Sequence, residues 1–171
     1  MGLGRLLVRS VIGGLFIGHG TQKLFSWFGG GGLDTTGEGF EAIGLAPGRR
    51  NALAAGLAEC GGGALLALGL ATPLAEAMLI SVMLTAIRTV HWKNGPWATN
   101  GGYEYNVVLI SALLGLAEVG PGRWSLDRVL GIERLGLVWL AAAAAFGTVG
   151  SLAATAAAQP AGDDAAESEV A

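Results

Sequence analysis

Ionisable side chains interrupt several long apolar stretches of this chain, and their types could support proton transfer to a bound ligand. His19 and Lys23 are four residues apart and Arg88 and His91 are three apart, so each pair would share one face of a helix. Glu59 lies inside an otherwise apolar stretch. A lone charge in hydrocarbon costs at least about 2.5–3.5 kcal/mol on insertion scales. These side chains should therefore face one another or a wet cavity.

The polar residues that we expect on one side of the membrane define a candidate site. Its members are His19, Gln22, Lys23, Glu59, Arg88, His91, Glu104 and Asn106. In this site Glu59 would pair with Lys23 or Arg88 and relay a proton. His19 and Lys23 would polarise an oxygen atom of the ligand.

Structural readings of the same residues stay open. Lys23 and Arg88 are long enough to snorkel to the lipid headgroups. Glu59 can form an ion pair, or stay protonated and hydrogen bonded, with no role beyond holding helices together, and His19 can be an interhelical hydrogen-bonding group. We expect no metal site, because the HxxxK spacing of His19 and Lys23 is not a ligand motif and no HxxE or HxxxH occurs.

The elements that must position these residues are membrane-spanning helices. Of the 171 residues 52% are hydrophobic and 13% are charged, whereas a soluble domain carries roughly a quarter charged residues. The mean hydropathy is +0.56. A span needs about 20 apolar residues, and the chain offers the segments 6–28, 51–70, 74–92, 103–120 and 135–158. We predict an all-α membrane protein, a four-helix transmembrane bundle with a fifth C-terminal transmembrane helix.

The sequence also makes predictions for the last of these segments and for the polar segments that connect or follow the spans. The alternative for 135–158 is a loosely bound helix, because alanine-rich helices also form in water. A polar loop at 29–50 should contain a short interfacial helix, and 120–134 should be an amphipathic interfacial segment. The acidic tail, 159–171, is expected to be disordered.

Small residues should permit close approach between the first two spans. We expect Gly14 and Gly18 to form a GxxxG contact on the 6–28 helix. The facing positions on the second span flank Glu59 and are Ala55, Gly56, Gly61, Gly62 and Gly63.

The distribution of positive charge predicts the orientation. We call the side on which the 6–28 segment ends side X and the side on which it begins side Y. Alternation of the spans puts Arg5, Arg9, Arg123, Arg128 and Arg134 on side Y, against Arg49, Arg50 and Lys93 on side X, with Lys23 and Arg88 just inside the membrane. The positive-inside rule then favours a multi-pass protein of the plasma membrane with a cytoplasmic N-terminus, although counting the two embedded residues balances the sides.

Several functional classes are disfavoured by the sequence. The 10 Lys and Arg residues are scattered, which is not the pattern of a nucleic-acid-binding protein. Cys60 is the single cysteine, so the chain cannot build an intrachain disulfide or a thiolate zinc site. We find no haem, flavin or iron–sulfur motif. Trp27, Trp92 and Trp97 indicate an interfacial aromatic belt.

The sequence resembles the DoxX family of small integral membrane proteins over residues 5 to about 130. The matching pieces are GHGTQKLFSWFGG at 18–30, the Glu59 region, TAIRTVHWKNGPW at 85–97, GGYEYNVVLISALL at 101–114 and GPGRWSLD at 120–127. The resemblance implies a DoxX-like four-helix membrane domain at 1–130, followed by the extra helix at 135–158 and the acidic tail at 159–171. It also implies a redox role, because some relatives are the membrane subunit of a thiosulfate:quinone oxidoreductase and others are linked to redox and sulfur-stress complexes.

Three hypotheses follow from these observations. The first is a membrane subunit of a quinone- or sulfur-compound-linked oxidoreductase, in which a polar cavity binds a quinone or a small sulfur species and electrons come from the substrates or from a redox partner subunit. The second is a non-catalytic membrane scaffold or assembly protein. The third and least favoured is a small-solute transporter, because no inverted repeat is visible. The surrounding lipid bilayer is the expected environment, and assembly into a homo-oligomer is left open.

Overall fold

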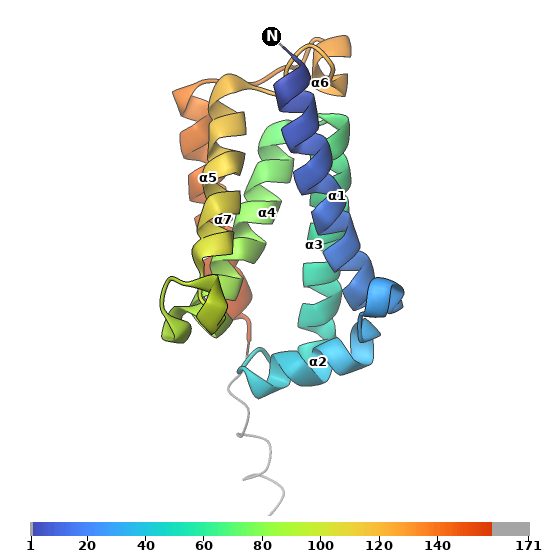
Figure 1. Cartoon of the computed structure of the whole chain (residues 1–171), viewed down its shortest axis with the longest axis vertical. Coiled ribbons are helices and arrows are strands. Elements are labelled where there is room, and N and C mark those ends of the chain that lie inside the picture. The colour runs from blue at the N-terminus through green and yellow to red at the C-terminus, as the bar shows by residue number, and fades with distance from the viewer. Residues whose placement is uncertain (1, 159–171) are drawn as a thin grey trace, which may run out of the picture.

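The computed structural model describes residues 2–158, and all the regular elements in that range are helices (Figure 1). The expectation for the 159–171 tail lies outside the described residues. The helices are α1 (Leu3–Phe25), α2 (Gly32–Ala42), α3 (Gly48–Leu68), α4 (Thr72–Ala86), α5 (Glu104–Val119), α6 (Leu126–Val129) and α7 (Leu137–Ala156). A π-helical turn at Ile87–His91 and a 3₁₀ turn at Trp92–Asn94 extend α4.

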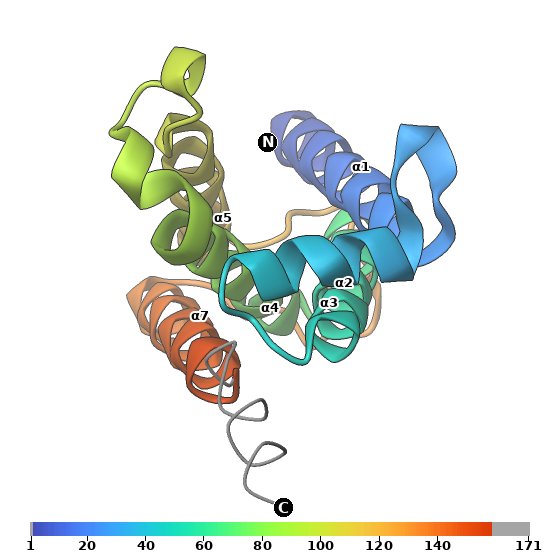
Figure 2. The ribbon, with the colours of Figure 1, turned by 90° about the horizontal axis from the view of Figure 1, so that it is seen from below.

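The long helices α1, α3, α4, α5 and α7 run along the long axis of the molecule (Figure 1). At one end α2 lies across the bundle, and at the other end α6 lies close to the N-terminus of α1. Seen along the axis, α1 lies beside α3 and α7 lies beside α4 (Figure 2). The α2 end is therefore side X and the α6 end is side Y, as the alternation of spans predicts.

Within residues 2–158, three helical stretches are long and apolar enough to cross a membrane, namely Gly48–Leu68, Thr72–Asn94 and Leu137–Ala156. The other two long helices run beside them. Helix α1 has 23 residues but carries Arg5, Arg9 and Lys23, and α5 has 16 residues, which at about 1.5 Å per residue is roughly 24 Å. Both contribute to the buried apolar core, α1 through Phe16 and α5 through Leu113. The protein is an all-α membrane protein.

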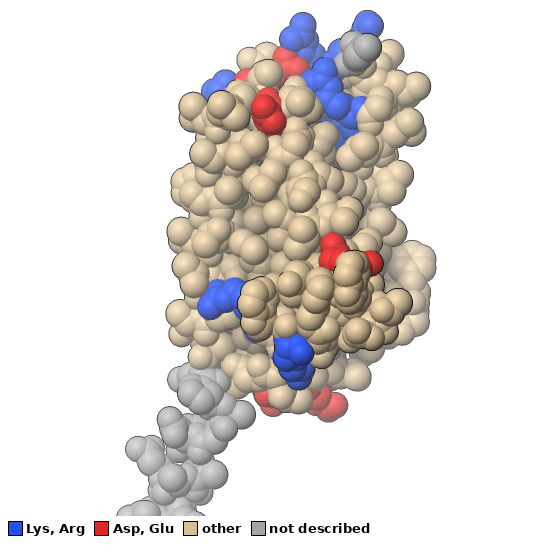
Figure 3. All heavy atoms as spheres, turned by 60° about the vertical axis from the view of Figure 1, so that its left-hand side comes forward, with Lys and Arg blue, Asp and Glu red and all other residues tan. Residues whose placement is uncertain are grey.

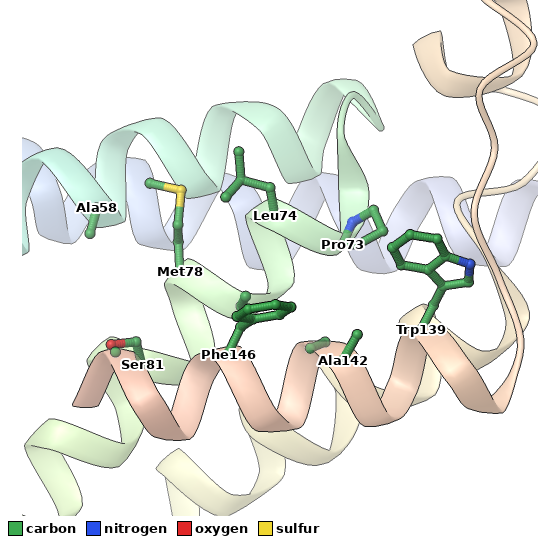
Figure 4. A pocket seen from close by; sticks show the side chains of 11 residues that line it. Ala58, Pro73, Leu74, Met78, Ser81, Trp139, Ala142 and Phe146 are labelled. Carbon is green, nitrogen blue, oxygen red and sulfur yellow. The ribbon is translucent and has the colours of Figure 1, made fainter. Parts of the chain in front are cut away.

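The C-terminal helix α7 packs closely against α4, so it is an integral part of the bundle and not a loosely bound helix. A Cβ atom built on Gly147 would lie 2.5 Å from the Cγ2 atom of Ile80, and Ala143 is 1% exposed. Beside this contact an apolar groove of about 510 Å³ lies between α3, α4 and α7. Phe146 and Trp139 of α7 line it opposite Met78 of α4 (Figure 4).

The close contact between α1 and α3 uses different glycines from those predicted. The expectation of a Gly14/Gly18 contact is wrong, because Cβ atoms built at both positions would meet open space. Gly13 and Gly20 lie on the contact instead, and their built Cβ atoms come within 2.5 Å of the carbonyl oxygen of Gly63 and of Cys60 Sγ. Adjacent helical positions differ by about 100° in direction. A one-residue error in the assumed rotation of α1 therefore moves the predicted contact to the outer face.

A tight turn at side Y joins α3 to α4. Gly69 adopts φ +64°, the left-handed conformation that favours glycine at a helix C-terminus. The backbone N–H of Gly69 donates to the carbonyl oxygen of Leu66, and that of Leu70 donates to Leu65. Pro73 then lies in the first turn of α4, where its missing N–H costs nothing. The predicted break at 71–73 is thus one turn centred on Gly69–Ala71.

On side X, the predicted interfacial helix in the 29–50 segment is present as α2. Leu45 follows it and is 6% exposed, so this connection is anchored in the bundle. The carboxyl group of Glu41 accepts a hydrogen bond from the backbone N–H of Gly48, at the start of α3. Helix α2 therefore closes the side X end of the α1–α3 pair.

Candidate functional site

A buried ion pair joins α1 to α3 in the side X half of the bundle. Lys23 Nζ lies 2.6 Å from Glu59 Oε2, and the side chains are 22% and 4% exposed. Glu59 reaches this depth because glycine at position 56 lets α1 approach α3 closely. Of the two partners that the sequence offered to Glu59, the structure selects Lys23.

His19 and Gln22 extend this pair along α1. His19 Nδ1 lies 3.1 Å from Gln22 Oε1, and since an amide oxygen only accepts, Nδ1 carries the proton in this arrangement. In the neutral ring Nε2 is then the basic nitrogen. Gln22 Nε2 donates in turn to the carbonyl oxygen of Phe28 at 3.2 Å. The ring of His19 is exposed, whereas the Glu59 carboxyl is not.

Lys23 is also held by its own helix, because Nζ lies 3.5 Å from the carbonyl oxygen of His19. Its ammonium group therefore contacts the buried Glu59 carboxylate and the backbone of His19, whose side chain is exposed. Just beyond it α1 ends, with Ser26 in the left-handed region at φ 61°. The aromatic side chains of Phe25, Trp27 and Phe28 are exposed around this end, as expected for residues at a membrane interface.

Arg88 does not reach the pair, so the polar residues do not converge as expected. Arg88 is exposed, and its Nη1 atom lies 3.5 Å from the hydroxyl of Ser151 on α7. Thr85 donates to the same hydroxyl at 3.1 Å. The π-helical turn at Ile87–His91 changes the direction of Arg88 from that of a regular helix. Helix α7, the predicted fifth helix, thus supplies a partner for Arg88 that the sequence analysis did not propose.

The remaining predicted residues have separate contacts near the start of α5. His91 Nδ1 lies 2.7 Å from the carbonyl oxygen of Gly101, which holds the 95–102 loop. Asn106 is 5% exposed and donates to Met83 Sδ at 3.4 Å. Glu104 is exposed. Four of the candidate residues thus lie on α1 and α3, and the other four lie on the extension of α4 and on α5, where they have separate contacts.

A second buried polar cluster lies in the side Y half, where the sequence analysis placed no site. Arg9 of α1, Glu76 of α4 and Asp127 of α6 are 0%, 2% and 1% exposed. Asp127 caps α4 from outside, because its carboxylate accepts from the backbone N–H groups of Ala71 and Thr72 at 2.7 and 3.0 Å and from the Thr72 hydroxyl. This carboxylate is favourably placed at the positive end of the α4 dipole.

Arg9 ties three segments together in this cluster. Its Nη2 atom donates to the carbonyl oxygen of Trp124 at 2.6 Å, and its guanidinium lies directly over Gly69, where a side chain would collide with it. Within the described residues, Arg9 Nε, Arg9 Nη1 and Glu76 Oε2 lack a hydrogen-bond partner. Glu76 could have been found from sequence, because it is a single acid in an apolar span, the same signal that pointed to Glu59.

Comparisons with known proteins agree with the resemblance seen in the motifs. The DoxX family model matches residues 4–92, more than half of the chain. An uncharacterized membrane protein, Rv3486, of Mycobacterium tuberculosis (strain ATCC 25618 / H37Rv) is 31% identical over 136 residues, which cover 73% of this chain and 80% of the relative. No solved structure matches the chain. The matched region contains Lys23, Glu59, Arg9 and Glu76 but ends before α5.

Proposed function

Because this chain belongs to the DoxX family of membrane proteins, we propose that it is an integral membrane subunit of a redox-linked complex. Its site is the α1–α3 group of His19, Gln22, Lys23 and Glu59. The ligand class is a quinone or a small sulfur compound, which presents an oxygen atom to Lys23. We further propose that the protein lies in the plasma membrane with its N-terminus in the cytoplasm.

The observation that carries this proposal is the geometry of the buried pair and its exposed neighbour. The Lys23 ammonium has three donors, of which the described contacts engage Glu59 and the backbone of His19, so one remains for a ligand oxygen. His19 Nε2 is available on the exposed side of α1. A cation paired with a carboxylate can stabilise negative charge on a ligand oxygen, and an imidazole one turn away on the same helix can exchange a proton with it.

In the proposed reaction, the protein binds a quinone and provides its protons, and the electrons come from elsewhere. Reduction of a quinone to a quinol takes up two electrons and two protons. The electrons come from the sulfur substrate or from a redox partner subunit. The chain's own residues bind the quinone oxygen and supply the two protons. One comes from Nε2 of His19 in its imidazolium form and the other from the Lys23 ammonium, while the Glu59 carboxylate stabilises that ammonium, and both donors then take up protons from water at the exposed side of α1. Exposed aromatic residues at the end of α1 give an apolar ligand a route from the lipid to this site.

The direct test is a quinone-reduction assay on the purified chain, alone and with its co-purifying partners, using thiosulfate or sulfide as donor. His19→Gln should lower the rate at least tenfold without changing accumulation, because the ring's described hydrogen bond stays within α1. Glu38→Gln is the matched control, since this exposed carboxyl lies on α2 at the same side. Absence of both bound quinone and quinone-dependent activity in all preparations would refute the proposal.

A scaffold role is the second candidate, and one observation favours it. The Lys23–Glu59 pair is short and links two helices, as a structural ion pair does. Under this reading His19→Gln leaves both the phenotype and the amount of protein unchanged, and only Glu59 or Lys23 variants reduce the amount of the assembled complex. The His19→Gln variant therefore distinguishes the two proposed functions.

A further inference from the structure

A polar pocket at side Y, unrelated to the α1–α3 site, has the character of an anion-binding site. Its volume is about 300 Å³, and it lies among the start of α1, the end of α5, α6 and the segment before α7. The side chains that line it are Arg5, Arg123, Arg128, Glu133, Val119 and Leu135, together with two glycines. We propose that this pocket binds the phosphate group of an anionic phospholipid.

The charges around the pocket leave a positive excess. Arg128 Nη1 is paired with Glu133 Oε2 at 2.6 Å, which neutralises one guanidinium. Arg5 Nη1 donates to the carbonyl oxygens of Val119 and Gly120 at 2.5 and 3.4 Å, which holds its guanidinium at the end of α5. Three arginines and one carboxylate therefore line one small pocket, so basic side chains outnumber acidic ones in its lining.

The geometry of these groups suits a phosphodiester. Arg5 is held by the end of α5, and Arg128 is held by Glu133, so two guanidinium planes are already positioned. Arg123 is exposed and lies over the ring of Trp124, 5.4 Å from its centroid. A guanidinium has five N–H donors in a planar fork, which matches the paired oxygens of a phosphate group.

The position of the pocket favours a lipid over free phosphate. It lies at the α6 end of the bundle, where basic side chains gather, together with some carboxylates, above a band of the side surface that shows no charged group (Figure 3). Large apolar side chains are exposed around it, with Leu3 64%, Trp124 60% and Leu135 54% accessible. A phospholipid headgroup lies at this boundary between charge and hydrocarbon, and its acyl chains would cover these apolar side chains.

The test measures lipid binding by the detergent-solubilised full chain with native mass spectrometry. Phosphatidylglycerol is compared with phosphatidylcholine of the same acyl chains, and inorganic phosphate is added as a competitor. An arginine whose guanidinium hydrogen bonds to the phosphate group contributes about fivefold in affinity, whereas an arginine outside the pocket lining does not. The Arg123→Gln/Arg128→Gln variant should therefore bind phosphatidylglycerol about 25-fold more weakly, and the Arg123→Lys/Arg128→Lys variant should retain most of the binding.

Arg134→Gln is the matched control, because Arg134 is exposed at the same side and lies over Trp139, outside the pocket lining. The thermal unfolding midpoint in detergent checks each variant, and Arg123→Gln alone replaces the double variant if the latter does not fold. Equal binding of both lipids, an equal loss in Arg134→Gln, or displacement of phosphatidylglycerol by millimolar inorganic phosphate would overturn the proposal. The last result would indicate a site for a soluble anion.

Discussion

Lys23→Met and Glu59→Gln break the same ion pair, yet we expect them to destabilise the bundle unequally. At a separation of 2.6 Å the gross attraction is about 6 kcal/mol for an effective dielectric constant of about 20, and desolvation of both charges offsets much of it. Lys23→Met leaves a carboxylate that is 4% exposed without its cation. The cost of such an uncompensated charge is about 3 kcal/mol.

Glu59→Gln leaves the Lys23 ammonium without its carboxylate, but this cation can reach the membrane interface. Lys23 is 22% exposed and lies in the last turn of α1, so its flexible stem can carry the ammonium to the interface. Glu59→Gln should therefore cost only about 1 kcal/mol, mainly through a weakened hydrogen bond. The double variant contains no charge at the site and should also cost about 1 kcal/mol, well below the sum of the single costs.

The assay is equilibrium unfolding of the full chain in mixed micelles, followed by helical circular dichroism, for the four members of this double-mutant cycle. Glu38→Gln on the exposed surface of α2 reports the effect of a carboxyl-to-amide change without burial. Equal costs for the two single variants, or a double variant that costs the sum of both, would refute the reasoning, because either result means that the pair is not buried together as described.

Three further changes test the packing, each by the unfolding midpoint in detergent. Gly13→Ala should destabilise the protein by about 1–3 kcal/mol, because its methyl group overpacks against α3. The methyl group of Gly14→Ala meets open space, so this change should be neutral or stabilise by up to about 1 kcal/mol. Equal effects of the two changes would mean that α1 is rotated differently about its axis. Asp127→Ala should cost about 2–4 kcal/mol by removing the buried cap of α4, while Glu133→Ala in the neighbouring surface pair should leave the midpoint unchanged. Gly147→Ala should loosen α7 from α4 and lower the midpoint relative to Gly14→Ala, and a rise would show that α7 is not packed there.

Much of the helical architecture was predictable because hydropathy and turn residues act locally. The segments predicted to span the membrane correspond to α1, α3, α4 with its extension, α5 and α7, with ends that differ by a few residues. The predicted partner choice for Glu59 was confirmed for Lys23 and not for Arg88. The π-helical turn at Ile87–His91, which contains Arg88, has no clear signature in the residues IRTVH.

The side Y cluster of Arg9, Glu76 and Asp127 could not be predicted from the sequence. Its members come from α1, α4 and α6, far apart in the chain, and Asp127 lies in a segment that composition alone assigns to the surface. Asp127 becomes a buried cap only because the tertiary fold places this segment against the α3–α4 turn. Gly69 similarly reads as an ordinary helix-ending glycine, whereas in the structure it also makes room for the guanidinium of Arg9.

The sequence by itself determined that this is a helical membrane protein, since lipid leaves helices as the way to satisfy the backbone of such apolar segments. It also indicated which polar residues lie toward the same end of the bundle, because position along a helix follows from counting residues. Only the tertiary structure decided which polar groups meet. Contact depends on the rotation of each helix, which changes by about 100° per residue, and on which helices become neighbours. Those properties placed Lys23 against Glu59, Arg88 against α7, and Gly13 where Gly14 had been expected.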